Sequence, residues 1–405
     1  MPGFDHDVRQ DFPLLRDYGE CYLDNAATAQ RPQRVLDAME KFYQNDNANP
    51  LRGFYPLSLR ATEQYENARA RVAKFIGAGD PSEVIFTRNT SESLNLVAYT
   101  YGLANVKAGD RVVVSILEHH SNLLPWQMVC RMTGAELKYM DCEMDGSFTD
   151  ETLDDCITEN TKLVAVTHVS NVLGCMTPVD KIVERAHKVG AVVVLDGAQS
   201  TPHTPVNVQE LGVDFLAFSG HKLMGPMGIG ALWGKRQLLE DMPPFMRGGE
   251  MIESVTREGA VWAEVPHKFE AGTVNAGGAV GLAAAIGYIE SIGFPAMMAQ
   301  EEKLVRYTME ALRDVPHVHV LGDKDPANHH GIVSFTVDGV HPHDVAEILE
   351  ADGLNVRSGH HCAQPLLKHL GPKSATRASF MFYNTLEEAQ RLVESIKNLR
   401  GRMGL

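Results

Sequence analysis

The sequence lacks the long apolar runs of membrane proteins and the clustered cysteines of disulfide-rich ones. A helix that crosses a bilayer needs about 20 consecutive apolar residues, and no stretch approaches that length, so no membrane association is expected. The six cysteines are scattered without a C-x-x-C pair, which argues against a disulfide framework and a zinc site. Because the amino terminus carries early acidic residues and no apolar signal segment, we expect a cytoplasmic protein.

Basic residues are also in short supply. The chain has 37 lysines and arginines against 52 aspartates and glutamates, for a formal net charge of −15. A surface of this sign repels phosphate backbones, so nucleic acid is not expected as a partner. Internal repeats and low-complexity tracts are missing as well. What remains is a globular chain of 405 residues, 44% hydrophobic, long enough for a large core and two domains.

One lysine stands where a predicted buried strand leaves the core. Lys222 follows the apolar run 215–218 and the short stretch Ser-Gly-His. Burial disfavours the ammonium form, so a lysine at the bottom of a cleft keeps the nucleophilic amine that Schiff-base chemistry with a carbonyl or pyridoxal phosphate requires. Taken alone, a solvated loop lysine is an equally good interpretation.

An aspartate ends a second predicted strand. The apolar run 191–195 leads into Asp196 and a glycine, the pattern of a buried parallel strand that brings a carboxylate to its C-terminal edge, where open α/β sheets bind ligands. A carboxylate that keeps a pyridine nitrogen protonated, with a lysine that carries the cofactor, is the pair that pyridoxal-phosphate enzymes need. A helix cap is the alternative for Asp196, but the two residues together favour the cofactor.

Other predicted strands also end in polar residues. The strand 83–87 runs into a turn with Thr90, whose hydroxyl and backbone N–H groups suit a phosphate, although helix capping explains the same residues. The strand 111–117 leads to His119, a candidate catalytic residue whose imidazole can stack on a planar cofactor and move protons near neutral pH. Of the two adjacent histidines only one should face the cleft. With the strand 162–171, the alternation of strands and helices predicts a mostly parallel, doubly wound sheet.

The pattern of elements predicts two domains. Residues 1–22 form an N-terminal segment expected to pack with the small domain, 23–294 a large cofactor-binding domain, and 295–405 a smaller α/β domain. Further elements are predicted as helices at 32–43, 61–76, 179–189, 276–292, 295–314, 343–351 and 385–399, strands at 331–337, 355–357 and 377–382, a loop at 45–59 and an extended excursion at 251–269.

Cys362 differs from the other cysteines in its surroundings. It lies in a loop marked by glycine, histidine and proline, residues 358–365, directly after the predicted strand 355–357. The usual state of a free cysteine is a small, inert buried residue. A metal site built from Cys362 and the adjacent histidines is not favoured, because neighbouring side chains diverge on an extended chain.

The motifs together resemble one known family. In order and spacing, LDNAATAQRP, RNTSESLNLVA, EHHSNLLPWQ, HVSNVLG, LDGAQS, FSGHKLMGPMGIG, FEAGTVN, RSGHHCAQPLL and TRASFMFYNT are similar to the class V aminotransferases, and most of all to the SufS-type (group II) cysteine desulfurases. The resemblance implies an aspartate-aminotransferase-like (type I) fold, pyridoxal 5'-phosphate as cofactor and L-cysteine as substrate. It also implies a homodimer and a SufE- or SufU-like sulfur acceptor for iron–sulfur cluster assembly.

The resemblance implies a role for each matching residue. Lys222 would carry the cofactor, Asp196 would hold the pyridinium proton, Gln199 would bind the ring hydroxyl and His119 would stack on the ring. The phosphate would be bound by Thr90, Ser91, Ser219 and His221, joined by Thr273 from a second subunit. The sequence departs from the family at Asn89 and Ser91, where relatives often have Gly and Thr.

The resemblance also implies the course of the reaction. Asn171 and Arg377 would fix the substrate carboxylate, the latter through its two-pronged guanidinium. Lys222 would remove the α-proton, and Cys362, as a thiolate, would attack the substrate sulfur to give a persulfide and alanine. Two alternatives stay open at this point: a selenocysteine lyase, and a non-catalytic scaffold that keeps only the fold.

Overall fold

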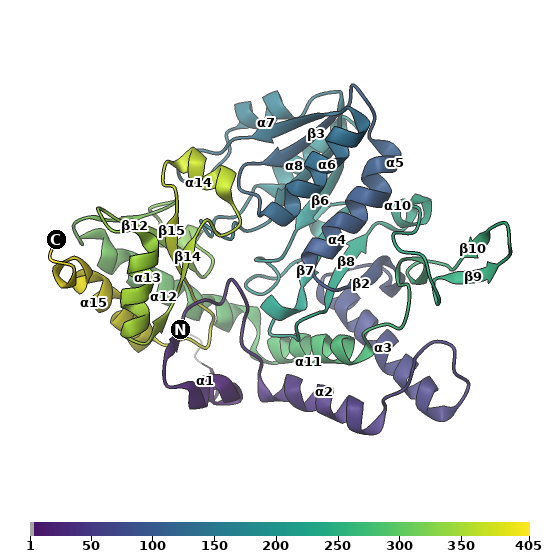
Figure 1. Cartoon of the computed structure of the whole chain (residues 1–405), viewed down its shortest axis with the longest axis horizontal. Coiled ribbons are helices and arrows are strands. Elements are labelled where there is room, and N and C mark those ends of the chain that lie inside the picture. The colour runs from purple at the N-terminus through teal and green to yellow at the C-terminus, as the bar shows by residue number, and fades with distance from the viewer. Residues whose placement is uncertain (1–3) are drawn as a thin grey trace.

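The computed structural model describes residues 4–405, and its largest element is a seven-stranded sheet (Figure 1). The strand order is β2-β8-β7-β6-β5-β3-β4. Only β8 runs against its neighbours, and the pairings from β7 to β4 are all parallel, which confirms the predicted mostly parallel sheet. The strands are β2 (Val84–Thr87), β3 (Arg111–Ser115), β4 (Glu136–Met140), β5 (Thr161–Thr167), β6 (Val192–Asp196), β7 (Phe215–Ser219) and β8 (Gly230–Gly234).

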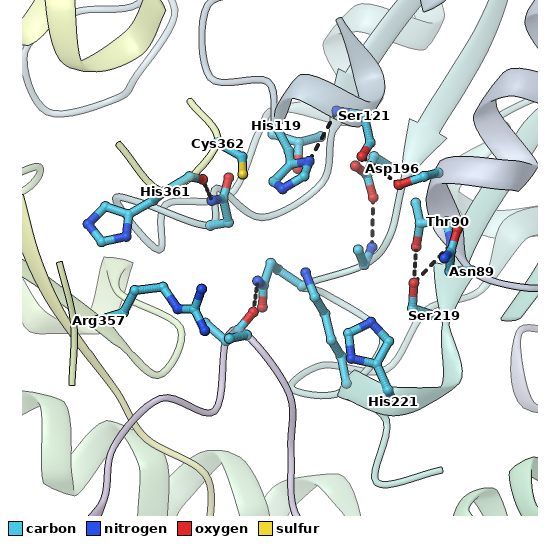
Figure 2. A pocket seen from close by; sticks show the side chains of 18 of the residues that line it. Asn89, Thr90, His119, Ser121, Asp196, Ser219, His221, Arg357, His361 and Cys362 are labelled. Atoms are coloured by element: carbon cyan, nitrogen blue, oxygen red, sulfur yellow. Dashed lines mark hydrogen bonds between the residues drawn. The ribbon is translucent and has the colours of Figure 1, made fainter. Parts of the chain in front are cut away.

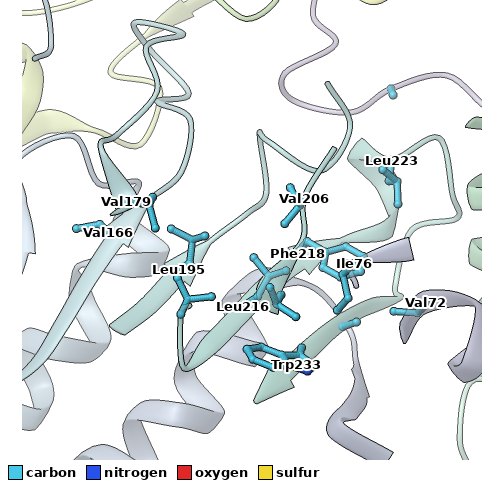
Figure 3. Packing of buried hydrophobic residues seen from close by; sticks show 14 of the residues in the cluster. Val72, Ile76, Val166, Val179, Leu195, Val206, Leu216, Phe218, Leu223 and Trp233 are labelled. Atoms are coloured by element: carbon cyan, nitrogen blue, oxygen red, sulfur yellow. The ribbon is translucent and has the colours of Figure 1, made fainter. Parts of the chain in front are cut away.

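Helices cover both faces of this sheet, and the strand sequences are apolar for that reason. Along β6, Val193 and Leu195 join one core cluster while Val192 and Val194 join the other, as the alternation of side chains along a strand requires. The first cluster includes Phe218, Leu216 and Trp233 (Figure 3). Each fully buried valine or leucine stabilises the fold by about 1.5–3 kcal/mol, so the sheet is a rigid support for its C-terminal edge.

The helices of this part differ in the core cluster to which they belong. α2, α3, α8 and α11 contribute to the first cluster, and α4 and α6 to the second. The bounds are α1 (Pro13–Tyr18), α2 (Gln33–Asn45), α3 (Pro56–Phe75), α4 (Thr90–Val97), α5 (Leu103–Asn105), α6 (Leu124–Thr133), α7 (Asp150–Cys156), α8 (Val179–Lys188), α9 (Val208–Leu211), α10 (Arg236–Asp241) and α11 (Ala276–Ile292).

A four-stranded antiparallel sheet, in the order β11-β12-β15-β14, lies in the C-terminal part of the chain. Its elements are β11 (Val318–Val320), β12 (Ile332–Val337), β14 (Arg357–Gly359), β15 (Ala375–Ser379), α12 (Phe294–Arg313), α13 (Pro342–Ala351), α14 (Gln364–Leu370) and α15 (Leu386–Arg402). The short strand β1 (Cys21–Tyr22) pairs with β13 (Leu354–Asn355), so the start of the chain contacts this region. The exact limits of the two domains stay a prediction.

Several predicted elements are shifted in the structure. α3 begins at Pro56, so the loop predicted over 45–59 covers only 46–55; a proline in the first helical turn loses no hydrogen bond and marks a start rather than a loop. The strand predicted at 377–382 is β15, which ends at Ser379. Phe382 lies past its end and is buried against Phe12 and Tyr288, so its apolar character reflects the core and not a strand.

Other differences are smaller. The strand predicted at 355–357 is divided between β13 and β14, and β4, β11, α6, α7 and α14 were not predicted because their patterns are short. The excursion at 251–269 contains a hairpin, β9 (Ile252–Val255) and β10 (Ala260–Trp262), that projects from the large sheet (Figure 1). In the region 4–405, no helix by itself is long and apolar enough to cross a membrane; α11 and α12 meet the criterion only as a pair bent by 80°.

Candidate active site

A cleft of about 330 Å³ opens at the C-terminal edge of the large sheet and is closed on its other side by β14, β15 and the Cys362 loop (Figure 2). The predicted site residues that line it are Thr90, Ser91, His119, Asn171, Asp196, Gln199, Ser219, His221, Lys222, Cys362 and Arg377. Thr273 does not line it. It lines a second hollow of the same chain, together with Arg88 and Asn275.

Lys222 lies in the short turn that follows β7, at the bottom of the cleft. Burial lowers the pKa of its amine to about 8; the carboxylate of Asp196 opposes this decrease and Arg377 adds to it. Within the described residues, no hydrogen bond ties the amine in place. The amine therefore has a substantial neutral fraction near physiological pH and is free to react with a carbonyl group.

Asp196 ends β6 beside Lys222 and is 3% exposed. Burial raises the pKa of its carboxyl, while the backbone N–H of Ala198 stabilises the charged form by donating to Oδ1 at 2.9 Å. In the described part of the chain, Oδ2 has no protein donor. A buried carboxylate with one oxygen unpartnered fits a protonated ring nitrogen.

Gln199 also has an unpartnered polar atom among the described residues. Its Nε2 donates to the carbonyl of Ala26 at 2.8 Å, whereas its buried Oε1 has no partner within residues 4–405. A buried acceptor without a donor is costly unless a ligand supplies one. This amide fits a ring hydroxyl, as the resemblance implies, so the residues around Asp196 suit pyridoxal phosphate.

The start of α4 forms the polar end of the cleft. Ser219 Oγ lies 2.9 Å from the backbone N of Thr90, which donates to it, and 2.7 Å from Thr90 Oγ1, while Ser91 Oγ lies 2.6 Å from Ser121 Oγ. Hydroxyls at the positive end of a helix form an environment for a phosphate. Capping, the alternative considered for Thr90, is instead performed by Asn89, whose side chain accepts from the backbone N of Glu92 at 3.0 Å.

His119 lines the cleft (Figure 2), and His120 is not among the residues that line it. His119 Nδ1 accepts the backbone N–H of Ser121 at 3.1 Å, so the proton of the neutral ring sits on Nε2. Burial and the nearby charge of Lys222 lower its pKa to about 3. The ring is therefore neutral at physiological pH and presents an N–H donor. His120 Nε2 accepts the backbone N–H of Gln364.

Cys362 is exposed, whereas the other five cysteines are buried. The backbone is left-handed at His361 (φ 51°) and Cys362 (φ 54°), a conformation rare for non-glycine residues. Two hydrogen bonds hold it: the backbone N of His120 donates to the Cys362 carbonyl at 2.7 Å, and Asn171 Nδ2 donates to the His361 carbonyl at 2.7 Å. The loop thus presents its thiol at the wall of the cleft.

The side of the cleft formed by β14 and β15 carries cationic residues. Arg377 on β15 is 3% exposed and donates from Nη1 to the carbonyl of Asn171 at 2.8 Å, while its Nε has no partner in the described chain. Burial lowers its pKa to about 10, so it stays charged near neutral pH. The side-chain amide of Asn171 donates to the backbone of the Cys362 loop. The contact of Asn171 with the substrate carboxylate stays a prediction.

Sequence reasoning missed three residues that line or border the cleft: Asp24, Ser121 and Arg357. Arg357 lies on β14 and forms an ion pair with Asp24, Nη2 to Oδ2, at 2.8 Å. Asp24 and Arg357 lie within motifs that were recognised, LDNAAT and RSGHHC. No local sequence pattern shows that segments so far apart in the chain meet. Only the positions of these two residues within the motifs could have pointed to their role.

The fold and the cleft define a pyridoxal-phosphate enzyme of the aspartate-aminotransferase type, in which the cofactor withdraws electrons from the substrate and the protein supplies orientation and proton transfer. The chain belongs to the class-V aminotransferase family, whose model matches residues 21–392. This confirms the family to which the motifs pointed, and with it the cofactor.

Named relatives cover nearly the whole chain. A "probable cysteine desulfurase" of Streptomyces coelicolor is 46% identical and spans 98% of this chain and 97% of its own. A "cysteine desulfurase" of Haloferax volcanii is 46% identical over 97% and 96%. Among solved structures, the apo cysteine desulfurase of Thermococcus onnurineus NA1 has a TM-score of 0.95 at 44% identity, covering 100% of both chains. The cysteine desulfurase CsdA of Escherichia coli has 0.90 at 37%, covering 98% of both.

Proposed function

We propose that this protein is a cysteine desulfurase that converts L-cysteine to L-alanine and retains the sulfur on Cys362 as a persulfide. The observation that carries the proposal is the position of Cys362. It is the one exposed thiol among the six cysteines, all of which lie within the described residues, and it lines the same cleft as Lys222 and Asp196. A nucleophilic thiol must be accessible and close to the cofactor site to receive sulfur.

Each step has a residue suited to it. Arg377 binds the substrate carboxylate, and the neutral amine of Lys222 accepts the α-proton. Bound pyridoxal phosphate supplies the electron withdrawal that makes this proton acidic. The Cys362 thiolate forms a bond to the substrate sulfur, and the Cβ–S bond breaks with its electron pair remaining on Cβ. Cβ then takes up a proton, and Lys222 returns a proton to Cα. Thiol plus L-cysteine thereby gives persulfide plus L-alanine with no external oxidant or reductant.

Two arginines line the cleft together with Cys362, Arg357 on β14 and Arg377 on β15. The neutral His119, with its N–H at Nε2, can donate a hydrogen bond in the cleft without adding charge. A scaffold that keeps only the fold has no need for this set of residues in one cavity, and the similarity to named cysteine desulfurases favours cysteine over selenocysteine.

We further infer the SufS-type group, a homodimer, and delivery of sulfur to a SufE- or SufU-like protein for iron–sulfur cluster assembly. The motifs of the Cys362 loop support the group. The position of Thr273 supports the dimer, because this residue does not line the cleft of its own chain and the resemblance assigns it to the phosphate of a second subunit. The exposure of Cys362 supports transfer to a protein thiol.

Release of alanine and sulfide from L-cysteine in the presence of a reductant tests the activity. The wild type should be yellow from its cofactor and active, and Cys362→Ala should keep its colour but lose cysteine turnover at least about a hundredfold. Cys130→Ala, which removes a buried thiol on α6, is the matched control and should stay active. If Cys362→Ala turns over L-cysteine as fast as the wild type, the proposal is wrong. Parallel assays with L-selenocysteine test the lyase alternative.

A further inference from the structure

Asp24 connects the two arginines of the cleft. Arg357 Nε lies 3.1 Å from both carboxylate oxygens of Asp24 and its Nη2 lies 2.8 Å from Oδ2, a side-on pair, while Arg377 Nη2 lies 3.4 Å from Oδ1. The two arginines are directly opposite each other in the β14–β15 ladder. Residues in that relation point to the same face of a sheet, where like charges repel. The carboxylate between them offsets this repulsion.

The position of Asp24 does not depend on the arginines. Its backbone forms a bridge with Ser379 of β15, and its carbonyl accepts from the backbone N of Ala27 at 3.1 Å and from the hydroxyl of Tyr22 at 3.3 Å. The side chain is 16% exposed. Asp24 is therefore a fixed anchor, whereas the Arg357 side chain is 51% exposed and has no other hydrogen bond within residues 4–405.

The three charges sum to one net positive charge, which matches one carboxylate. Arg377 is held at Nη1 by the carbonyl of Asn171, and its Nε has no partner among residues 4–405. Arg357 uses Nε and Nη2 for Asp24, and its Nη1 has no hydrogen bond to the same residues. Both side chains line the cleft that contains Lys222. Without its anchor, the half-exposed arginine would sample solvent and its charge would be screened.

We propose that Asp24 is a positioning residue for the carboxylate group of the amino-acid substrate, because it holds Arg357 and Arg377 side by side in the cleft. Asp24 does not touch the reacting atoms, and it acts through the two guanidinium groups. The inference rests on the proposed function only in that the substrate is an α-amino acid; the identity of its side chain is not involved.

This role is tested by the binding of two ligands, L-alanine and L-alaninamide, to the protein loaded with pyridoxal phosphate. The change in cofactor absorbance reports the binding of each. The two ligands differ only in the carboxylate. Asp24→Asn should weaken L-alanine binding about tenfold to a hundredfold, the effect of misplacing a charge-assisted hydrogen-bond donor. L-alaninamide should change by less than about twofold, as for substitutions without a direct contact.

Asp46→Asn is the matched control. Asp46 is also 16% exposed and pairs with an arginine, Arg60, that is also 51% exposed, at 2.8 Å, but outside the cleft. The Asp46→Asn variant should bind both ligands with unchanged affinity. Asp24→Glu, which keeps the charge, should restore part of the affinity for L-alanine.

Two results would overturn the proposal. If Asp24→Asn weakens the binding of both ligands equally, Asp24 has only a structural role. If L-alanine binds as tightly as before or more tightly, removing the negative charge of Asp24 matters more than any change in the position of the arginines. If Asp24→Asn does not fold, as judged by thermal unfolding and cofactor colour, Arg357→Gln takes its place; unchanged L-alanine binding in that variant contradicts the proposal. Failure of the wild type to release alanine from L-cysteine would contradict the desulfurase function but not this one, since the readout is binding.

Discussion

Asn171 donates its side-chain amide to the backbone carbonyl of His361 at 2.7 Å, and so ties the loop that carries Cys362 to the segment that follows β5. The loop needs such support because His361 and Cys362 both adopt a left-handed backbone. A strained conformation persists only where its surroundings hold it. The cofactor side of the cleft thereby sets the position of the thiol on the other side.

Asn171→Ala should loosen the loop without removing the cofactor. Loss of a buried hydrogen bond of this kind costs about 1–3 kcal/mol, so we expect alkylation of Cys362 by iodoacetamide in the substrate-free protein to accelerate and alanine release to fall about tenfold. Cofactor absorbance should persist. The control is Asn105→Ala, whose amide also donates to a backbone carbonyl, that of Tyr101 at 2.9 Å, away from the cleft. An unchanged alkylation rate would show that the amide does not restrain the loop.

The capture of pyridoxal phosphate by the apoprotein should depend on pH through Lys222. The pKa of this amine is about 8, and only the neutral form attacks a carbonyl, so the neutral fraction rises as the pH increases toward and above that value. Below pH 8, the capture rate should fall about tenfold for each pH unit. Stopped-flow absorbance measures the rate. Borohydride reduction should fix the cofactor to the wild type and not to Lys222→Ala, and a rate with a midpoint near pH 10.5 would contradict the lowered pKa.

Gly230→Ala should destabilise the phosphate end of the cleft. A Cβ atom at this position would lie 2.6 Å from the carbonyl oxygen of Phe218 and 2.8 Å from Cα of Asn89, both backbone atoms that cannot move aside easily. We expect a loss of about 1–3 kcal/mol in the free energy of unfolding together with weaker cofactor binding. Gly259→Ala, where a Cβ meets nothing within 4 Å, is the control in the same denaturation and cofactor titrations. Wild-type stability of Gly230→Ala would mean that β8 shifts freely.

The buried pair of Arg69 and Glu270 should tolerate replacement of both partners better than of one. Arg69 donates to Glu270 at 2.7 and 2.9 Å, and their side chains are 1% and 2% exposed. Arg69→Met leaves a buried carboxylate without its counter-ion and should cost about 3–5 kcal/mol. The double variant with Glu270→Leu should recover part of this, because the buried donors of Tyr65 and Phe86 then lose their acceptor. Urea denaturation measures both. The exposed pair of Lys188 and Glu184 is the control, and Lys188→Met should change stability by less than about 1 kcal/mol.

The amino-acid sequence by itself determined many of the longer elements and most of the polar residues of the cleft. Buried strands are apolar throughout, so the change to a polar residue at Asp196 and at the stretch before Lys222 marked the sheet edge. Helix α11 was predicted with the bounds that the structure has. These signals are local, because they arise from the alternation of side chains within one element and from the residues at its ends. Motif resemblance then supplied the family and the cofactor.

Only the tertiary structure decided which distant groups meet. Asp24 and Arg357 are 333 residues apart, and their ion pair exists because β1 and β13 bring the start of the chain beside the C-terminal sheet. The tautomer of His119 and the exposure of the Cys362 thiol likewise depend on contacts made in the folded chain. A charge or donor in the sequence has no assigned partner until packing places one within hydrogen-bonding distance, and burial then sets its pKa.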